Sequence, residues 1–327
     1  MNEKTTELLE KYDLSVNKIN RARGGFVCFT DKGPKLFREY RGNEKHLDIE
    51  MWILDRIKDS GLCKADYIIK NLDGEILTKS DDGTGYILKE WYNSHECNIW
   101  DKSELYSSCR MMATVHKILS GYKSENGTMF ELYPCRLDDE FVRHTFELKR
   151  ARTFIRNKNR KSEFELKILA CFERFYEKAV TATEKMSECK YEEQRGCAYE
   201  KQSICHGSFN YHNIVFDDRE AVPVNFERAV VDVQITDFYD FLRKVMEKHN
   251  WDVELGNRMI SEYDKIRKIS DEEHRILKVM LMYPEKFWKI VNQYYNGNKS
   301  WIPDKNMGKL DVVLNQEDRK EKFIYNL

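Results

Sequence analysis

The feature of this 327-residue chain that most constrains its fold is a change in hydrophobic patterning near residue 92. Before that point, short apolar runs alternate with Asp-Gly and Asp-Lys-Gly-Pro turn signals, a pattern that predicts antiparallel strands. One helical pattern, near residues 43–60, interrupts them. The expected strands cover residues 26–29, 35–40, 67–71, 75–79 and 86–92.

After residue 92 the patterning is mainly helical, apart from a short β-rich segment at 203–226. The sequence therefore predicts an α+β chain with two parts. Residues 1–92 form a small antiparallel sheet lobe with one helix, and residues 93–327 form a larger, mainly helical lobe that carries a hairpin. The expected helices cover residues 101–119, 138–157, 163–187, 235–249, 253–265, 271–279 and 285–296.

Composition excludes several classes of protein. The 55 basic and 56 acidic side chains nearly cancel, so net charge gives no reason to expect binding to nucleic acid or an anionic membrane. We expect no transmembrane segment, because no apolar run reaches the ~20 residues that span a bilayer. We expect no signal peptide either, because the charged N-terminus lacks an apolar core. The nine cysteines form no CxxC pair, which favours reduced thiols over a zinc or redox motif.

The segment His206–Asn213 has the sequence HGSFNYHN. It resembles the catalytic loop H-G-D-x-x-x-x-N of the aminoglycoside phosphotransferase and choline kinase-like superfamily. Ser208 stands where that family has an aspartate. Farther on, Asn225 stands where the family has a metal-binding aspartate, and the stretch Asp232–Phe238 resembles the family's closing D-x4-D-L element.

Other stretches narrow this resemblance. Residues Tyr86–Tyr92, followed by His95–Cys97, resemble the strand and hinge of CotS-type bacterial spore coat proteins, and so do Glu147–Arg156 and Phe241–Trp251. The resemblance covers nearly the whole chain. It implies a two-lobed, protein-kinase-like fold, synthesis in the mother-cell cytoplasm, and assembly on the endospore coat with other spore coat proteins as partners.

The resemblance also implies catalytic and metal-binding positions. Phosphoryl transfer needs Mg²⁺ and a carboxylate near the attacking hydroxyl. A hydroxyl at Ser208 is a poor base at neutral pH, so general-base assistance of ~10²–10⁴-fold is lost. His206 and Asn213 complete the catalytic set. The metal ligands would be Asn213, Asn225 and Glu227, of which Glu227 alone brings the negative charge that Mg²⁺ prefers.

A nucleotide site follows from the same resemblance, with ATP and Mg²⁺ as the candidate cofactors. Arg38 stands at the position of the phosphate-binding lysine, with Lys35 as the alternative, and Glu50 is its expected helix partner. A tight glycine turn and a hinge strand supply the remaining contacts. The expected nucleotide-binding residues are Gly24, Gly25, Arg38, Glu50, Glu90 and Tyr92.

Three functions remain open. The first, favoured by the two lost carboxylates, is a degenerate kinase that serves as a coat or scaffold protein. The second is an active phosphotransferase on a small molecule or coat protein that uses Glu227 or Asp232. The third is a nucleotide-binding regulatory pseudokinase. The sequence disfavours a zinc site and a serine hydrolase, because the ligand spacing and the G-x-S-x-G turn are missing.

A basic run at residues 149–161 contains few acids. It fits either a solvated helix face or a docking surface for an acidic or phosphorylated partner. Nucleic acid is not an expected partner, because the run lacks the interleaved aromatics of a single-strand binding surface.

Overall fold

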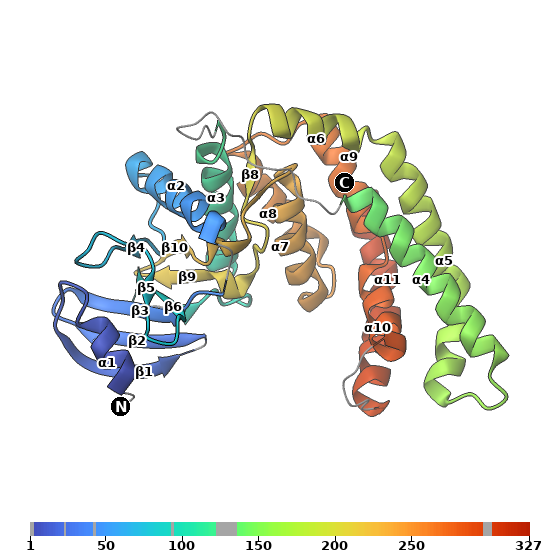
Figure 1. Ribbon diagram of the computed structural model, residues 1–327. Helices are drawn as coiled ribbons and strands as arrows, with labels where there is room; N and C mark the ends of the chain where they lie inside the picture. Colours follow the sequence, from blue (N-terminus) through green and yellow to red (C-terminus); the bar gives the residue numbers. More distant parts are fainter. Residues whose placement is uncertain (1–2, 23, 42–43, 93–94, 122–135, 297–302) are drawn as a thin grey trace. The chain divides into compact units, whose positions relative to one another are not determined.

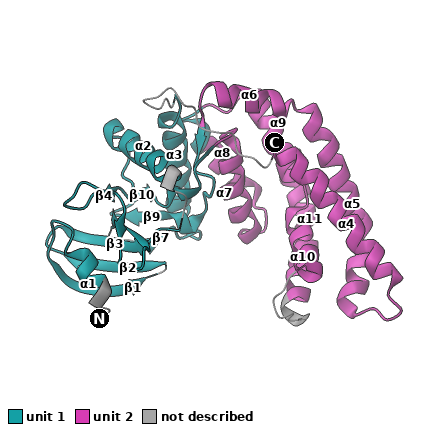
Figure 2. Cartoon of the chain, in the orientation of Figure 1, with its two compact units in different colours: residues 1–122, 204–230, 262–267 teal, residues 123–203, 231–261, 268–327 magenta. Residues whose placement is uncertain are grey.

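The computed structural model describes residues 3–22, 24–41, 44–92, 95–121, 136–296 and 303–327. The chain divides into two compact units (Figure 2). Unit 1 comprises residues 1–122, 204–230 and 262–267, and unit 2 comprises residues 123–203, 231–261 and 268–327. The expected division at residue 92 stays a prediction. None of the helices in the described ranges is both long and apolar enough to cross a membrane.

Unit 1 is built on a six-stranded antiparallel sheet in the order β1-β2-β3-β6-β4, with β5 paired to β6 (Figure 1). The predicted hairpin is present, but the strands expected at residues 67–71 and 75–79 are only two residues long each. The sequence missed β1, whose exposed polar residues interrupt any apolar run. The strands are β1 (Val16–Ala22), β2 (Gly25–Thr30), β3 (Gly33–Glu39), β4 (Ile68–Ile69), β5 (Thr78–Lys79) and β6 (Gly85–Glu90).

Each face of this sheet has its own helix. The short helix α1 (Glu3–Leu9), which the sequence did not predict, contributes Leu8 and Leu9 to a core with Phe37 and Leu88. The predicted helix appears as α2 (Glu44–Ser60), and its expected first residue, 43, lies outside the described residues. Successive strand residues point to opposite faces, so Arg38 and Lys89 lie on the face opposite Phe37 and Leu88.

A smaller antiparallel sheet in unit 1, in the order β10-β9-β7, carries the predicted hairpin. The helix α3 (Lys102–Ile118) packs against β10 and begins at Asp101, whose carboxylate accepts the backbone N–H groups of Ser103 and Glu104. The remaining elements here are β7 (His95–Glu96), β8 (Ile204–Cys205), η1 (Tyr211–Asn213), β9 (Ile214–Asp217), β10 (Glu220–Pro223) and η2 (Phe226–Arg228).

Unit 2 is helical, and capping boxes at Ser162 and Ser270 start two of its helices. The predicted helices are confirmed within three residues at each end, but the sequence missed α6 and α11. The elements are α4 (Leu137–Asn157), α5 (Glu163–Glu188), α6 (Tyr191–Glu200), α7 (Ile235–Lys248), α9 (Asp271–Met282), α10 (Glu285–Asn296) and α11 (Pro303–Tyr325), while β11 (Val230–Val231) and α8 (Val253–Asp264) span the unit boundaries.

The predicted α+β class is confirmed: an antiparallel sheet region is followed by a mainly helical remainder (Figure 1). Eight of the nine cysteines lie in the described residues, and no disulfide joins any of these eight. Cys135 lies outside the described residues.

Candidate functional site

The site residues predicted from the sequence all belong to unit 1, although they come from segments far apart in the chain. Strands β3 and β6 and helix α2 supply one group, and the segment between β8 and η2 supplies the other.

The catalytic-loop segment is held by a buried histidine and a required glycine. The ring of His206 is fully buried, stacks on Phe209 with 4.3 Å between ring centroids, and places Nε2 2.9 Å from the carbonyl oxygen of Val224. Gly207 has φ +71°, and a Cβ there would lie 2.0 Å from the carbonyl oxygen of Arg228. His206 therefore supports the loop from inside rather than facing a substrate.

Five residues expected in the site form a chain of hydrogen bonds and one ion pair, called the polar row below. The amide of Asn213 donates to the backbone carbonyl of Ser208 (2.9 Å), and the amide of Asn225 donates to Oδ1 of Asn213 (3.0 Å). Arg38 then donates through Nη1 to Oδ1 of Asn225 (2.9 Å) and forms an ion pair with Glu227. The structure thus brings together Ser208, Asn213, Asn225, Glu227 and Arg38.

This arrangement does not fit a Mg²⁺ ion. The amide oxygens of Asn213 and Asn225 already accept hydrogen bonds, and the carboxylate of Glu227 is paired with a guanidinium. Mg²⁺ prefers carboxylates in octahedral geometry. Within the described ranges there is no cluster of three or more His, Cys, Asp or Glu side chains suited to a metal. The other carboxylate considered, Asp232, is buried and belongs to unit 2.

The expected pairing of Glu50 with Arg38 is wrong. Glu50 Oε1 lies 2.7 Å from Nζ of Lys89, and Asp66 Oδ2 also lies 2.7 Å from that nitrogen. Burial alone would lower the pKa of Lys89, but the two carboxylates outweigh it and raise this pKa above its ordinary value. The partner of the helix residue Glu50 is therefore a lysine on β6, two strand positions from Ile87, the residue opposite Arg38.

The sequence analysis missed Lys89 and Asp66. Lys89 ends an apolar run in β6, and a lysine inside a buried strand could have been read as needing an acidic partner. No sequence signal marks Asp66, although its Oδ2 also accepts the backbone N–H of Asn225 (3.0 Å). That bond holds Asn225 in a left-handed conformation with φ +69°.

Three other candidates make contacts with the protein itself. Lys35 lies on the sheet face opposite Arg38 and pairs with Glu90, with Nζ and Oε2 2.8 Å apart. The hydroxyl of Tyr92 donates to the carbonyl of Ala65 (2.6 Å), and burial raises the pKa of Tyr92 above its ordinary value. These contacts explain their positions without a nucleotide.

A cavity of about 460 Å³ lies beside the turn that joins β1 and β2. Its lining includes Gly24 and Gly25 together with Arg38 and Glu227, so the cavity connects the predicted glycine turn to the polar row. Gly25 permits close packing here, because a Cβ would lie 2.5 Å from the carbonyl oxygen of Phe37. The sequence did not predict the two further arginines in the lining, Arg21 and Arg41.

Comparisons with known proteins agree with this fold. A crystal structure of an aminoglycoside phosphotransferase from Alicyclobacillus acidocaldarius matches with a TM-score of 0.88 at 17% identity, covering 98% of this chain and 94% of that one. An AMP-bound spectinomycin phosphotransferase matches with a TM-score of 0.64 at 10% identity, covering 96% and 98%. These likenesses confirm the protein-kinase-like fold.

The sequence comparisons show the family. Spore coat protein S of Bacillus subtilis (strain 168) is 20% identical over 342 residues, which cover 98% of this chain and 93% of that protein. The model of a family described as "Spore coat putative kinase YutH" matches residues 5–327. The chain therefore belongs to the family described as "Spore coat putative kinase YutH".

Proposed function

We propose that this chain is a structural component of the endospore coat whose kinase-like site does not transfer phosphate. Family membership and the similarity to spore coat protein S support the location, and other coat proteins are the proposed partners. The observation that carries the loss of activity is the position of Arg38, which binds both Asn225 and Glu227.

The guanidinium of Arg38 takes the place that a metal would need. Arginine stays protonated at every physiological pH, so its charge cannot be removed to admit a cation. Two unit positive charges 4 Å apart repel by roughly 4 kcal/mol at an effective dielectric constant of 20, and a divalent ion would be repelled more strongly. Together with a serine at position 208, this argues that metal-assisted phosphoryl transfer has been lost.

The cavity beside Gly24 and Gly25 favours a second candidate, nucleotide binding without transfer or with atypical transfer. Its lining carries Arg21 and Arg38, and one structural relative is described as bound to AMP. In this reading ATP would bind through the arginines, and Glu227 would be the remaining carboxylate for an active phosphotransferase.

A thermal-shift titration with ATP, with and without Mg²⁺, separates these functions. We expect no Mg²⁺-dependent shift and no ATP turnover for the natural chain. A metal-independent shift would support nucleotide binding without transfer. Mg²⁺-dependent turnover that Glu227→Gln abolishes would contradict the proposal and support the active enzyme.

A restored variant tests whether Arg38 is the cause. The triple change Arg38→Lys, Ser208→Asp and Asn225→Asp returns the carboxylates and removes the guanidinium. We expect this variant to gain an ATP shift that requires Mg²⁺, whereas Ser208→Asp with Asn225→Asp alone gains less because Arg38 still occupies the site. Equal gains in the two variants would show that Arg38 does not block the metal.

A further inference from the structure

Helix α4 of unit 2 exposes large apolar side chains along one ridge. Val142, Phe146 and Phe154 are 57%, 59% and 58% exposed, and Arg150 continues their spacing of four residues. Residues four apart form a continuous ridge on a helix surface. The buried face of α4 is carried by other residues, among them Leu148, so the core does not account for the ridge.

The ridge leads into a cavity of about 290 Å³ between α4 and α10. Phe154 stands at the cavity and meets the ring of Tyr295 edge-on, with 5.4 Å between centroids. Trp288 also lines it and is fixed from behind by the ring of His144, which stacks 3.4 Å away. The cavity walls are thus aromatic and held in place.

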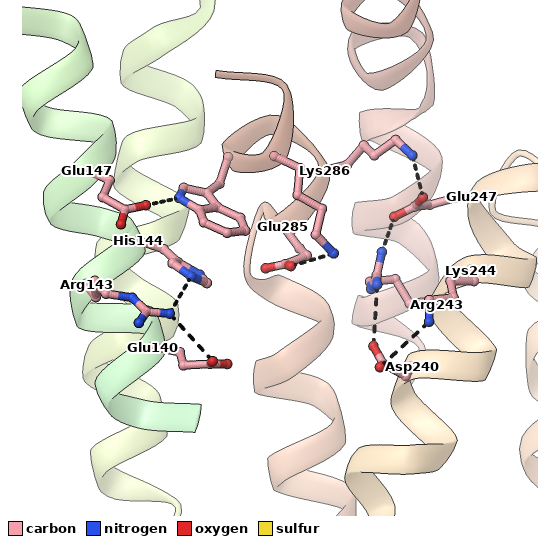
Figure 3. Close-up of polar contacts among 12 residues, drawn as sticks. Glu140, Arg143, His144, Glu147, Asp240, Arg243, Lys244, Glu247, Glu285 and Lys286 are labelled. Carbon is pink, nitrogen blue, oxygen red and sulfur yellow. Dashed lines mark hydrogen bonds and ion pairs between the residues drawn. The ribbon is translucent and has the colours of Figure 1, made fainter. Parts of the chain in front are cut away.

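The cavity lining carries one acidic and one basic side chain, Glu147 and Arg150. The lining residue Glu147 accepts a hydrogen bond from the indole N–H of Trp288 (2.8 Å), and Figure 3 shows Glu147 and His144 directed from α4 toward α10. Lys149, Arg150 and Arg156 have no carboxylate partner within the described part of the chain.

The rest of the basic run behaves differently. Arg152 pairs with Glu173 of α5, and Lys158 pairs with Glu165 (2.7 Å). Intramolecular ion pairs therefore engage these two cations, whereas Arg150, which lies on the ridge, has no carboxylate partner within the described residues. The ridge thus combines three exposed apolar side chains with one exposed cation, Arg150, that an acidic partner could engage.

We propose that this ridge and cavity bind an acidic, elongated peptide segment of another protein, with one aliphatic or aromatic side chain of that segment in the cavity. From Val142 to Phe154 the ridge rises about 18 Å, or roughly three helical turns, which suits a peptide better than a small molecule. Acidic residues on the segment would complement Arg150 and its basic neighbours. The inference goes beyond the proposed coat role and holds whether or not unit 1 transfers phosphate.

Fluorescence anisotropy with the full-length chain tests the proposal. The probe is a fluorescein-labelled synthetic helix of about 16 residues, with leucines and one phenylalanine on one face and glutamates elsewhere. We expect it to bind, and a peptide with lysine in place of every glutamate not to bind. Added salt should weaken the binding of the acidic peptide, because it screens the charges.

Two variants locate the binding surface. Arg150→Glu reverses the charge on the ridge, and Asn292→Trp places a bulky ring in the cavity lining. We expect each variant to bind the acidic peptide with an affinity lower by roughly tenfold or more. Arg160→Glu makes the same charge change beyond the end of α4. The affinity of this variant for the acidic peptide should therefore stay within about twofold of that of the natural chain. Circular dichroism melting confirms that each variant is folded.

Several outcomes would overturn the proposal. One is equal affinity for the acidic and lysine peptides, or no binding of either. Another is an equal effect of Arg150→Glu and Arg160→Glu, which would place the binding elsewhere. Sedimentation that shows a dimer broken by Arg150→Glu would make a second copy the occupant. Tighter binding of a labelled oligonucleotide, with the same dependence on Arg150, would make nucleic acid the occupant.

Discussion

Two cations on the same face of the sheet in unit 1 differ in what surrounds them. Lys89 is fully buried and lies between the carboxylates of Glu50 and Asp66. The side chain of Arg38 is 16% exposed and binds Asn225 and Glu227 next to a cavity. The first group has the features of a structural ion cluster, whereas the second consists of residues that the sequence predicted for the nucleotide and metal sites.

The difference teaches that the ion pair between the sheet and helix α2 can use a lysine on β6 in place of a residue on β3 while the fold is kept. Because Lys89 holds Glu50, Arg38 is left to bind Asn225, one of the predicted metal ligands. Asp66 connects the two groups, since one carboxylate oxygen contacts both Lys89 and the backbone of Asn225. Stability and site chemistry are therefore assigned to different cations.

Substitution of Lys89 should have the largest effect. Lys89→Met leaves two buried carboxylates without their cation, so we expect the free energy of unfolding to fall by about 3–5 kcal/mol. Urea denaturation followed by circular dichroism measures it. Lys35→Met is the matched control. Its partner Glu90 is 37% exposed and stays solvated without the lysine, so we expect this variant to lose only about 0–1 kcal/mol of unfolding free energy. Equal losses in the two variants would contradict the comparison.

A smaller effect is expected at the residue that connects the two groups. Asp66→Asn removes a charge from Lys89 and should cost about 1–3 kcal/mol of unfolding free energy. It should also increase hydrogen exchange at the backbone N–H of Asn225, because that N–H donates a hydrogen bond to the Asp66 carboxylate. Glu50→Gln is the control: it should lower stability without changing exchange at that amide. Unchanged exchange in Asp66→Asn would remove the proposed connection.

Arg38 should matter little for stability. Arg38→Met breaks partly exposed contacts, so we expect a loss of no more than about 1 kcal/mol. The same variant frees Glu227 and the oxygen of Asn225, and a thermal-shift titration with MgCl₂ should then show stabilisation that the natural chain lacks. Arg21→Met changes another arginine of the same cavity and should show no stabilisation by MgCl₂. A large loss of stability would make Arg38 a structural cation like Lys89.

The last prediction contrasts Lys89 with a buried base, His144, for which burial outweighs the nearby acids. Burial lowers the pKa of His144 below its ordinary value of 6.5, and this outweighs Glu285 and Glu147, which act in the opposite direction. The unfolded chain therefore takes up a proton first, so stability falls as pH drops through 6.5 toward the lower folded value. Melting temperatures between about pH 8 and pH 5 should fall less in His144→Phe than in the natural chain. Identical slopes would contradict this assignment.

The sequence predicted much of the fold because helical periodicity and turn residues are local signals. Helices α2, α3 and α5 and the hairpin β9–β10 were expected within a few residues of their ends. Strand β1 was missed because its residues are polar on the exposed side and its pairing with β2 supplies what its composition does not. Helix α1 was missed because seven residues give too short a periodic pattern.

The candidate site divides in the same way. Motif spacing placed Ser208, Asn213 and Asn225 in one segment, and the structure joins Asn213 to both of the others by hydrogen bonds. The partner of Glu50 could not be predicted in this way. Lys89 is 39 residues away, and which strand residue faces a helix depends on sheet register and packing.

The sequence by itself determined the kinase-like loop, the two lost carboxylates and the family to which they point. Only the tertiary structure decided that Arg38 would bind Asn225 and Glu227 while Lys89 binds Glu50. The physical reason is that residue type and spacing are written along the chain, whereas the partner of a charged side chain is selected by the packing of strands and helices that are distant in sequence.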